Sequence, residues 1–155
     1  MHVEIRRAAP DEPGVAALID ELDRYQLALY PRESNHLDPA EELSKDNVHF
    51  VCACAAGQIV GCGAVKKFGE HGGYGEIKRM FVLLSHRGQG ISGALLQALE
   101  EHLHAHGIRY ARLETGVHQA EALALYHNRG YINRGPFGDY WHDPVSVFME
   151  KDLSR

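Results

Sequence analysis

The sequence predicts an α/β domain, α+β in layer terms, with about four helices flanking a mixed, mostly antiparallel sheet of about six or seven strands. Two observations predict this class. Apolar residues 80–84 lead through a glycine-rich turn into an apolar-periodic helix, which is typical of a strand–helix–strand crossover. Three strand-like segments joined by short turns precede that glycine-rich turn, so most neighbouring strands are expected to be antiparallel.

The N-terminal quarter predicts one strand, one long helix and a loop. Residues 2–7 alternate apolar and polar side chains, as a half-buried strand does. Pro10, Asp11 and Pro13 end that strand and start a helix, which stops at Tyr30-Pro31. The polar residues 31–39 predict a surface loop, and a short helical piece is expected at 40–45.

The central part of the chain predicts three strands in series. Residues 48–55 and 59–67 are strand-like and flank a short hairpin turn, and residues 74–82 alternate again after the glycine-rich segment 68–73. A dinucleotide-binding domain would instead carry its glycine loop directly after its first strand.

The C-terminal part completes the crossover and adds two strands. Gly107 ends the helix after the glycine-rich turn, and residues 110–115 form the next strand. Three histidines in the last turns of that helix, at positions 102, 104 and 106, are interpreted as a solvated end where imidazolium suits the helix dipole. Residues 119–129 predict a further helix, and 131–134 and 145–151 predict the last strands, separated by a loop.

Composition limits the class of protein. A chain of 155 residues predicts a single domain, residues 1–155. The 16 basic and 21 acidic residues, a net charge of −5, argue against a nucleic-acid partner and favour cationic substrates. No segment has the length of a membrane span and the first residues do not resemble a signal peptide, so we expect a cytoplasmic protein with no membrane partner. The C-x-C spacing of Cys52 and Cys54 does not suit metal ligands, and we expect no metal.

The glycine-rich turn at residues 85–90 is a candidate phosphate site. The first N–H groups of a helix lack partners within it, and with the helix dipole they favour an anion. Gly88 and Gly90 let the backbone approach a phosphate closely, and Arg87 adds a cation. Residues 88–93 match the dinucleotide pattern G-x-G-x-x-G, with Glu114 at the distance expected of a ribose-binding acid.

The same turn has a second interpretation. Residues 87–92 resemble the pyrophosphate loop of the GNAT superfamily of acetyl-CoA-dependent N-acetyltransferases, Q/R-x-x-G-x-G/A, although Ser92 departs from its last position. Residues 76–82 resemble the strand that leads into that loop. Residues 119–131 resemble the family's N-x-x-A-x-x-L-Y-x-x-x-G-F/Y segment, with Gln119 in place of the usual Asn. The order of elements also looks like the GNAT fold, so the chain resembles a small bacterial member of this superfamily from end to end.

The resemblance implies that acetyl-CoA is the co-substrate. Its pantetheine arm is expected to pair with the end of the strand at residues 80–82, and the thioester is expected where that strand splays from the one bearing Glu114. The residues implied in cofactor binding are Met80, Phe81, Val82, Arg87, Gly88, Gln89, Gly90, Ile91, Ser92, Gln119 and Tyr126.

Amine acylation requires a base for the ammonium proton and an acid for the leaving thiolate. Glu76 lies where several family members keep their general base, and Glu114 is a second candidate; Glu76, Glu114 and a water chain all stay open. The resemblance implies that Tyr126 protonates the thiolate. A solvent-exposed strand carboxylate and a core tyrosine are the structural alternatives for Glu76 and Tyr126.

For the acceptor we expect a small primary amine or a peptide end near loop residues Tyr30, Arg32, Tyr140 and Trp141. The predicted function is N-acetyl transfer from acetyl-CoA by direct attack in a ternary complex. A non-catalytic acyl-CoA sensor and an NAD-binding module are the alternatives; retention of Glu76 and Tyr126 favours an enzyme over a sensor. The sequence leaves the acceptor's identity and the formation of a homodimer open.

Overall fold

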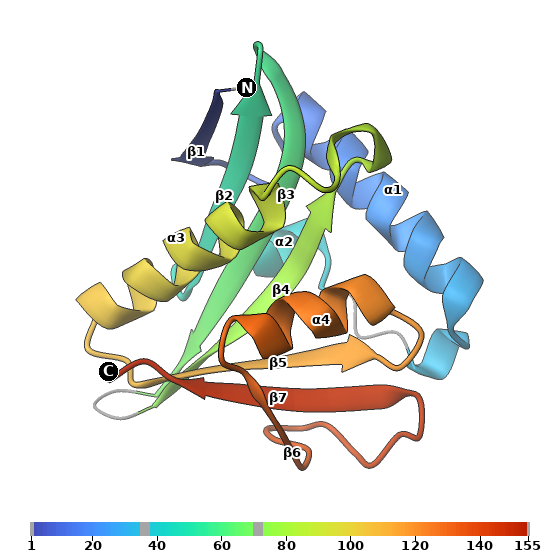
Figure 1. Cartoon of the computed structure of the whole chain (residues 1–155), viewed down its shortest axis with the longest axis vertical. Coiled ribbons are helices and arrows are strands. Elements are labelled where there is room, and N and C mark those ends of the chain that lie inside the picture. The colour runs from blue at the N-terminus through green and yellow to red at the C-terminus, as the bar shows by residue number, and fades with distance from the viewer. Residues whose placement is uncertain (1, 35–37, 70–72, 155) are drawn as a thin grey trace.

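A computed structural model describes residues 2–34, 38–69 and 73–154, with the elements in the expected order (Figure 1). The strands are β1 (Val3–Arg7), β2 (Val48–Ala55), β3 (Gln58–Phe68), β4 (Tyr74–Val82), β5 (Tyr110–Gly116), β6 (Ile132–Arg134) and β7 (Ser146–Asp152). The helices are α1 (Pro13–Leu29), α2 (Ala40–Leu43), α3 (Ile91–Ala105) and α4 (Ala120–Asn128), with short 3-10 turns at Arg32–Ser34 and Leu84–His86. Residues 35–37 and 70–72 of the two expected loops lie outside the described residues. The predicted fold class is confirmed.

The sheet is mixed and mostly antiparallel. Its seven strands, counted over the described residues, follow the order β1-β2-β3-β4-β5-β7-β6, and β4 with β5 is the parallel pair. That pairing stops at Ile77 and Leu113, while β5 continues to pair with β7 as far as Gly116. The ends of β4 and β5 therefore diverge, as Figure 1 shows. A dinucleotide-binding domain has a mostly parallel sheet, which this arrangement lacks.

A bulge in β4 contributes to this divergence. The β3–β4 register shifts between Cys62 and Ala64, opposite Arg79, which has a positive φ of 58°. A bulge bends its strand and raises the local twist. The buried Arg79 guanidinium bonds to Asp23 of α1 and donates to the Asp38 carbonyl at 2.7 Å. These contacts fix the outer half of β4 against α1 and the segment before α2.

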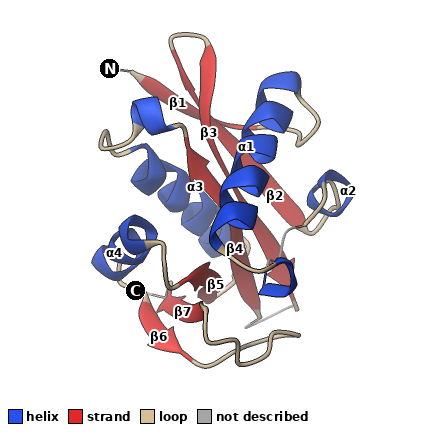
Figure 2. Ribbon diagram, turned by 90° about the vertical axis from the view of Figure 1, so that its right-hand side faces the viewer, coloured by secondary structure: helices blue, strands red, loops and turns tan. Residues whose placement is uncertain are grey.

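Helices cover both faces of the sheet (Figure 2). On one face, Val15, Leu18 and Ile19 of α1 pack against Cys52 and Cys62. On the other face the leucines of α3 form a larger cluster with α4 and the inner strands. All four of them are fully buried: Leu95, Leu96, Leu99 and Leu103. Their spacing is the helical period that the sequence displays.

The three cysteines are free thiols on the α1 side of the sheet, where Cys52 and Cys62 are buried and Cys54 is partly buried. Cys52 and Cys54 lie on one face of β2 with their sulfur atoms 3.9 Å apart, and burial raises the pKa of the Cys62 thiol to about 12. Across the described ranges, no group of three or more His, Cys, Asp or Glu side chains has the arrangement of a metal site. None of the helices described is both long and apolar enough to cross a bilayer.

The solvated histidine end that we expected on α3 holds for the exposed His104 and His106 but not for His102. The His102 ring is half-buried and stacks on the ring of His49 of β2, with ring centroids 3.8 Å apart. It also packs against the His106 ring at a centroid distance of 4.1 Å. Its Nε2 lies 2.9 Å from Nζ of Lys67. Burial, followed by repulsion from His49 and Lys67, lowers the pKa of His102 to about 4. The expectation of an imidazolium was therefore wrong for His102, because this end of α3 packs against β2 and β3; only His104 and His106 are exposed.

Candidate active site

A cleft of about 570 Å³ occupies the space between the diverging ends of β4 and β5. The start of α3 forms one end of the cleft, α4 forms a side wall, and the C-terminal half of α1 contributes Leu22, Tyr25 and Gln26 to the lining. The predicted site residues that line it are Tyr30, Glu76, Met80, Phe81, Val82, Arg87, Gly88, Gly90, Ile91, Ser92, Glu114, Gln119, Tyr126 and Tyr140.

The glycine-rich turn gives the cleft an open helix start. Gly88 and Gly90 have φ values of 76° and 80°, a region that residues with a side chain rarely adopt. Gly90 is the N-cap of α3, and a Cβ at Gly88 or Gly90 would meet no atom within 4 Å. The Arg87 side chain folds back along the turn, and its Nε donates to the Val82 carbonyl at 3.0 Å. The turn therefore presents unpaired N–H groups beside a cation.

Glu114 is the carboxyl group best suited to proton transfer. It lies on β5 at the edge of the divergence, and one carboxylate oxygen accepts a hydrogen bond from the Ser146 hydroxyl at 2.8 Å. Burial raises the pKa of Glu114 to about 7; the Ser146 hydrogen bond opposes this shift, and repulsion from Glu76 adds to it. A carboxyl group with such a pKa exchanges a proton readily near neutral pH.

Glu76 has different surroundings. Its side chain is buried, and its Oε2 accepts a hydrogen bond from the Tyr140 hydroxyl and lies 3.7 Å from Nζ of Lys78. Nζ of Lys78 lies 3.2 Å from Oδ1 of Asp38, so this ion pair links β4 to the segment before α2. Burial raises the pKa of Glu76, whereas Lys78 and Tyr140 oppose that shift. Glu76 thus connects β4 with the β6–β7 loop.

Tyr126 projects from α4 into the floor of the cleft. Only 6% of the residue is exposed, and its ring packs edge-on against Tyr131 with centroids 5.6 Å apart. Burial raises its pKa, and the Glu114 charge adds to the shift. Among the described residues, its hydroxyl has no hydrogen-bond partner. Because buried tyrosine hydroxyls usually have one, this hydroxyl is available to a group bound in the cleft.

Gln119 and Tyr30 close the turn between β5 and α4. The Gln119 side-chain oxygen accepts hydrogen bonds from the Gly116 N–H at 3.0 Å and from the Thr115 hydroxyl at 3.3 Å. The Tyr30 hydroxyl accepts from the His118 N–H at 3.1 Å. A Cβ at Gly116 would overlap that hydroxyl, so glycine is required there. Through Tyr30, the end of α1 reaches across the cleft to β5.

Three predicted site residues are not among those that line the cleft. They are Gln89, Arg32 and Trp141, and Trp141 is 52% exposed. Sequence reasoning missed Lys78, Arg79 and Ser146. Strand alternation from Glu76 could have placed Lys78 on the same face. The sequence carries no clear signal for the β4 bulge that turns Arg79 to that face, or for the β5–β7 register that brings Ser146 to Glu114.

Comparisons with known proteins match most of the chain. Residues 15–131 match the model of the acetyltransferase (GNAT) family. The chain is 48% identical to IAA acetyltransferase of Azospirillum brasilense over 152 residues, covering 98% of this chain and 99% of the relative. It is 33% identical to the uncharacterized N-acetyltransferase YsnE of Bacillus subtilis, covering 99% and 100% of the two chains.

Solved structures share the fold over nearly the whole chain. A protein of Klebsiella pneumoniae assigned as an acyl-CoA N-acyltransferase has a TM-score of 0.82 at 39% identity, with 97% of each chain covered. PaiA N-acetyltransferase of Thermoplasma acidophilum, solved with coenzyme A, has a TM-score of 0.75 at 17% identity, with 98% of this chain and 99% of that chain covered. The family match, the extent of these similarities and the fold establish that this chain belongs to the GNAT family of acetyltransferases.

Proposed function

We propose that the protein is an N-acetyltransferase that moves an acetyl group from acetyl-CoA to a primary amine by direct attack in a ternary complex. One observation carries the proposal. A single cleft contains an open helix start, a carboxyl group whose pKa is raised to about 7, and a buried phenol with no partner among the described residues. These are the anion site, the base and the acid that the reaction needs.

The helix start and the end of β4 are the proposed cofactor site. The pyrophosphate binds the N–H groups of residues 88–92 beside the Arg87 side chain, because unpaired amides and the helix dipole favour an anion there, whereas the Arg87 N–H already donates to the Leu84 carbonyl. The pantetheine arm lies along residues 80–82 of β4, whose edge toward β5 pairs with no strand beyond Ile77 among the described residues. GNAT-fold structures solved with coenzyme A and with acetyl-CoA support a CoA thioester as the ligand.

The proposed chemistry assigns one proton transfer to each titratable group. Glu114 removes a proton from the ammonium group of the acceptor, and the neutral amine attacks the thioester carbonyl. The tetrahedral intermediate then collapses, the carbon–sulfur bond breaks, and Tyr126 donates its phenolic proton to the departing thiolate. Glu76 instead has a structural role and stabilises the cleft lining through Tyr140 and Lys78, since its Oε2 already contacts both.

The acceptor side of the cleft suits a small amine. Tyr25, Tyr30 and Tyr140 contribute aromatic surface, and Glu114 offers a carboxylate to an ammonium group. The relative from Azospirillum brasilense is named for IAA, so IAA belongs in the first set of acceptors to assay. We place the reaction in the cytoplasm, where free cysteines such as these three persist.

Release of CoA thiol tests the proposal against the sensor alternative. Purified protein is incubated with acetyl-CoA and a panel of polyamines, amino acids, aminoglycosides, peptide N-termini and IAA, and the acetylated product is identified by mass spectrometry. We expect thiol release that depends on one acceptor class. Tight binding of acetyl-CoA without turnover on any acceptor would favour a sensor, which needs neither Glu114 nor Tyr126.

A further inference from the structure

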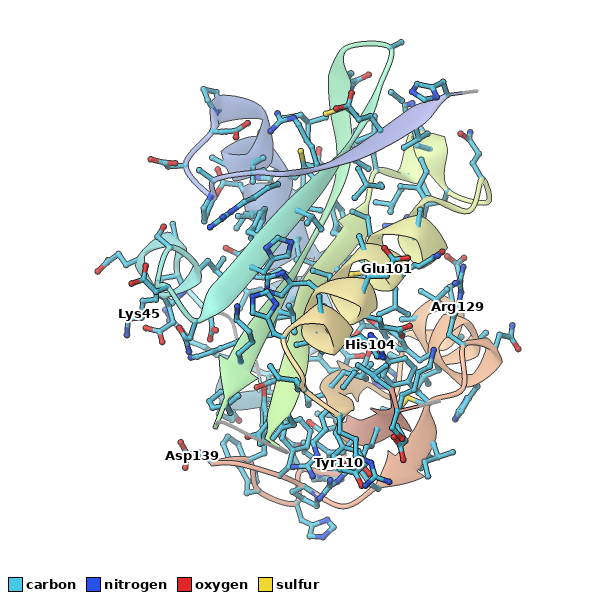
Figure 3. The ribbon with its side chains drawn as sticks, turned by 90° about the vertical axis from the view of Figure 1, so that its left-hand side faces the viewer. Lys45, Glu101, His104, Tyr110, Arg129 and Asp139 are labelled. Carbon is cyan, nitrogen blue, oxygen red and sulfur yellow. The ribbon has the colours of Figure 1, made fainter. Side chains whose placement is uncertain are left out.

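Arg129 lies between the end of α4 and the start of α3. Its backbone caps the C-terminus of α4, while its guanidinium reaches the first turn of α3 at Gly93. A Cβ at Gly93 would overlap the Arg129 Nη2 and lie 3.0 Å from its Cζ. Figure 3 labels Arg129 at the end of α4, with the α3 ribbon beside it. Gly93, the third glycine of the turn-and-helix motif, therefore leaves room for a cation.

The guanidinium of Arg129 lacks the partner that comparable arginines have. Among the half-buried arginines, Arg6 pairs with Glu12, whereas Arg112 and Arg134 both pair with Glu150. Within the described part of the chain, Arg129 is half-buried and has no ion pair and no side-chain hydrogen bond. A partly desolvated cation without a counter-charge is unfavourable.

The position of the charge adds to this imbalance. The first turn of α3 is the positive end of a 15-residue helix with unpaired N–H groups, which repels a cation. The Arg87 side chain lies on the turn that precedes the same helix. Arg87 and Gly93 line this end of the cleft, and the Arg129 guanidinium lies against Gly93 without itself lining the cleft, so an anion bound at the helix start would compensate both cations and the helix dipole.

We propose that Arg129 is a phosphate-binding residue for acyl-CoA, contacting either the pyrophosphate or the 3′-phosphate of the ribose. This inference rests on the proposed function. A guanidinium can form two parallel hydrogen bonds with a phosphate group, which neutral neighbours cannot replace. Arg129 would thereby make recognition depend on the phosphates of CoA as well as on the thioester.

Calorimetric titration of Arg129→Gln with acetyl-CoA and with dephospho-CoA tests the proposal. We expect acetyl-CoA to bind on the order of tenfold more weakly, the usual effect of losing a charged hydrogen bond. Arg109→Gln is the matched control, because it removes an exposed arginine that pairs with Asp152. The affinity of this variant for acetyl-CoA should equal that of wild type. If Arg129 contacts the 3′-phosphate, wild type and Arg129→Gln will bind dephospho-CoA, which lacks that phosphate, with equal affinity. If Arg129 contacts the pyrophosphate, Arg129→Gln will bind dephospho-CoA more weakly than wild type does.

Gly93→Ala provides an independent variant of the same contact. Its methyl group must displace the guanidinium, so acetyl-CoA affinity should fall in the wild-type background and change little further in Arg129→Gln. If wild type binds acetyl-CoA and Arg129→Gln binds it with the same affinity and the same dependence of that affinity on salt, the proposed role of Arg129 is overturned. The proposed function would then still stand. Failure of the wild-type protein to bind acetyl-CoA would overturn the proposed function as well.

Discussion

Glu114 and Glu76 both face the cleft, but their contacts give them different tasks. Glu114 is bonded to one neutral hydroxyl, whereas Glu76 is engaged by Tyr140 and Lys78. We therefore expect Glu114→Gln to lower kcat on the order of 10² or more and to remove the acidic limb of the kcat/KM profile, which in wild type should rise through pH about 7. The variant should still bind acetyl-CoA, as calorimetry would check.

Two companion variants sharpen this assignment. Glu76→Gln removes a charge that raises the pKa of Glu114, so the acidic limb should move to lower pH and the plateau should remain. Ser146→Ala removes a hydrogen bond that lowers the pKa of Glu114, so the limb should move to higher pH. If Glu76→Gln loses the acidic limb of the kcat/KM profile and Glu114→Gln keeps it, Glu76 is the base.

Tyr126 can be tested by removing only its hydroxyl. Tyr126→Phe keeps the packing against Tyr131, and in the free protein no hydrogen bond to a described residue is lost. We expect kcat to fall on the order of 10² or more with a much smaller change in KM for acetyl-CoA, as measured by steady-state kinetics. Full activity from pH 6 to pH 9 would return this tyrosine to a purely structural role.

Sequence patterns identified most of the cleft lining but little of how its side chains interact. Glu76, Glu114 and Tyr126 were candidates from the start, yet their surroundings depend on residues distant in sequence. Tyr140 reaches Glu76 from 64 positions away, and Ser146 reaches Glu114 from 32. Such pairings follow from strand register and loop packing, which local periodicity does not encode. The sequence could therefore not decide between the two carboxyl groups.

At the scale of elements, α3 combines two functions in one helix. Its start faces the cleft, and its last turns stack His102 against His49 and His106. The lowered pKa means that the folded protein favours neutral His102, so stability is greatest above the unfolded pKa of about 6.5 and is lost as the pH falls toward 4. Arg7 and Lys67 also oppose protonation of this ring.

Thermal unfolding at different pH values tests this stack. Between pH 7 and pH 5, wild type should lose about 1 kcal/mol more stability than His102→Gln, a value discounted for partial solvation of the ring. His104→Gln is the control, since that residue is exposed on the same helix, and it should follow the wild-type curve. Equal pH dependence in wild type and His102→Gln would show that the stack does not contribute.

Element boundaries were predictable where amphipathic periodicity was strong. The predicted strands at 48–55 and 74–82 coincide with β2 and β4, and the helix expected after Pro13 ends before Tyr30, as α1 does. The environment of His102 was mispredicted because the sequence gives the helix face but not the strand that covers it. His49, which covers it, is 53 positions earlier in the printed sequence.

At the scale of the whole molecule, the divergence of β4 and β5 makes the cleft possible. Their pairing ends at Ile77 and Leu113, and residues from the starts of α3 and α4 line the cleft that results. The order of elements predicted a mixed sheet, and the family resemblance predicted where it opens. The bulge at Arg79 was not predictable, because a positive φ at an arginine is unfavourable in isolation and depends on its contacts with α1.

The central claim is that this cleft binds acetyl-CoA through the helix start at Gly90. Calorimetric titration of acetyl-CoA into wild type, Gly90→Asp and Gly90→Asn tests it most directly. Both substitutions add a side chain of similar size at a position with φ of 80°, but only Asp adds a negative charge against the phosphates. We predict clear binding by wild type, partial weakening in Gly90→Asn and severe loss in Gly90→Asp. Equal acetyl-CoA affinity in all three proteins, or binding of NAD in place of CoA by wild type, would contradict the account.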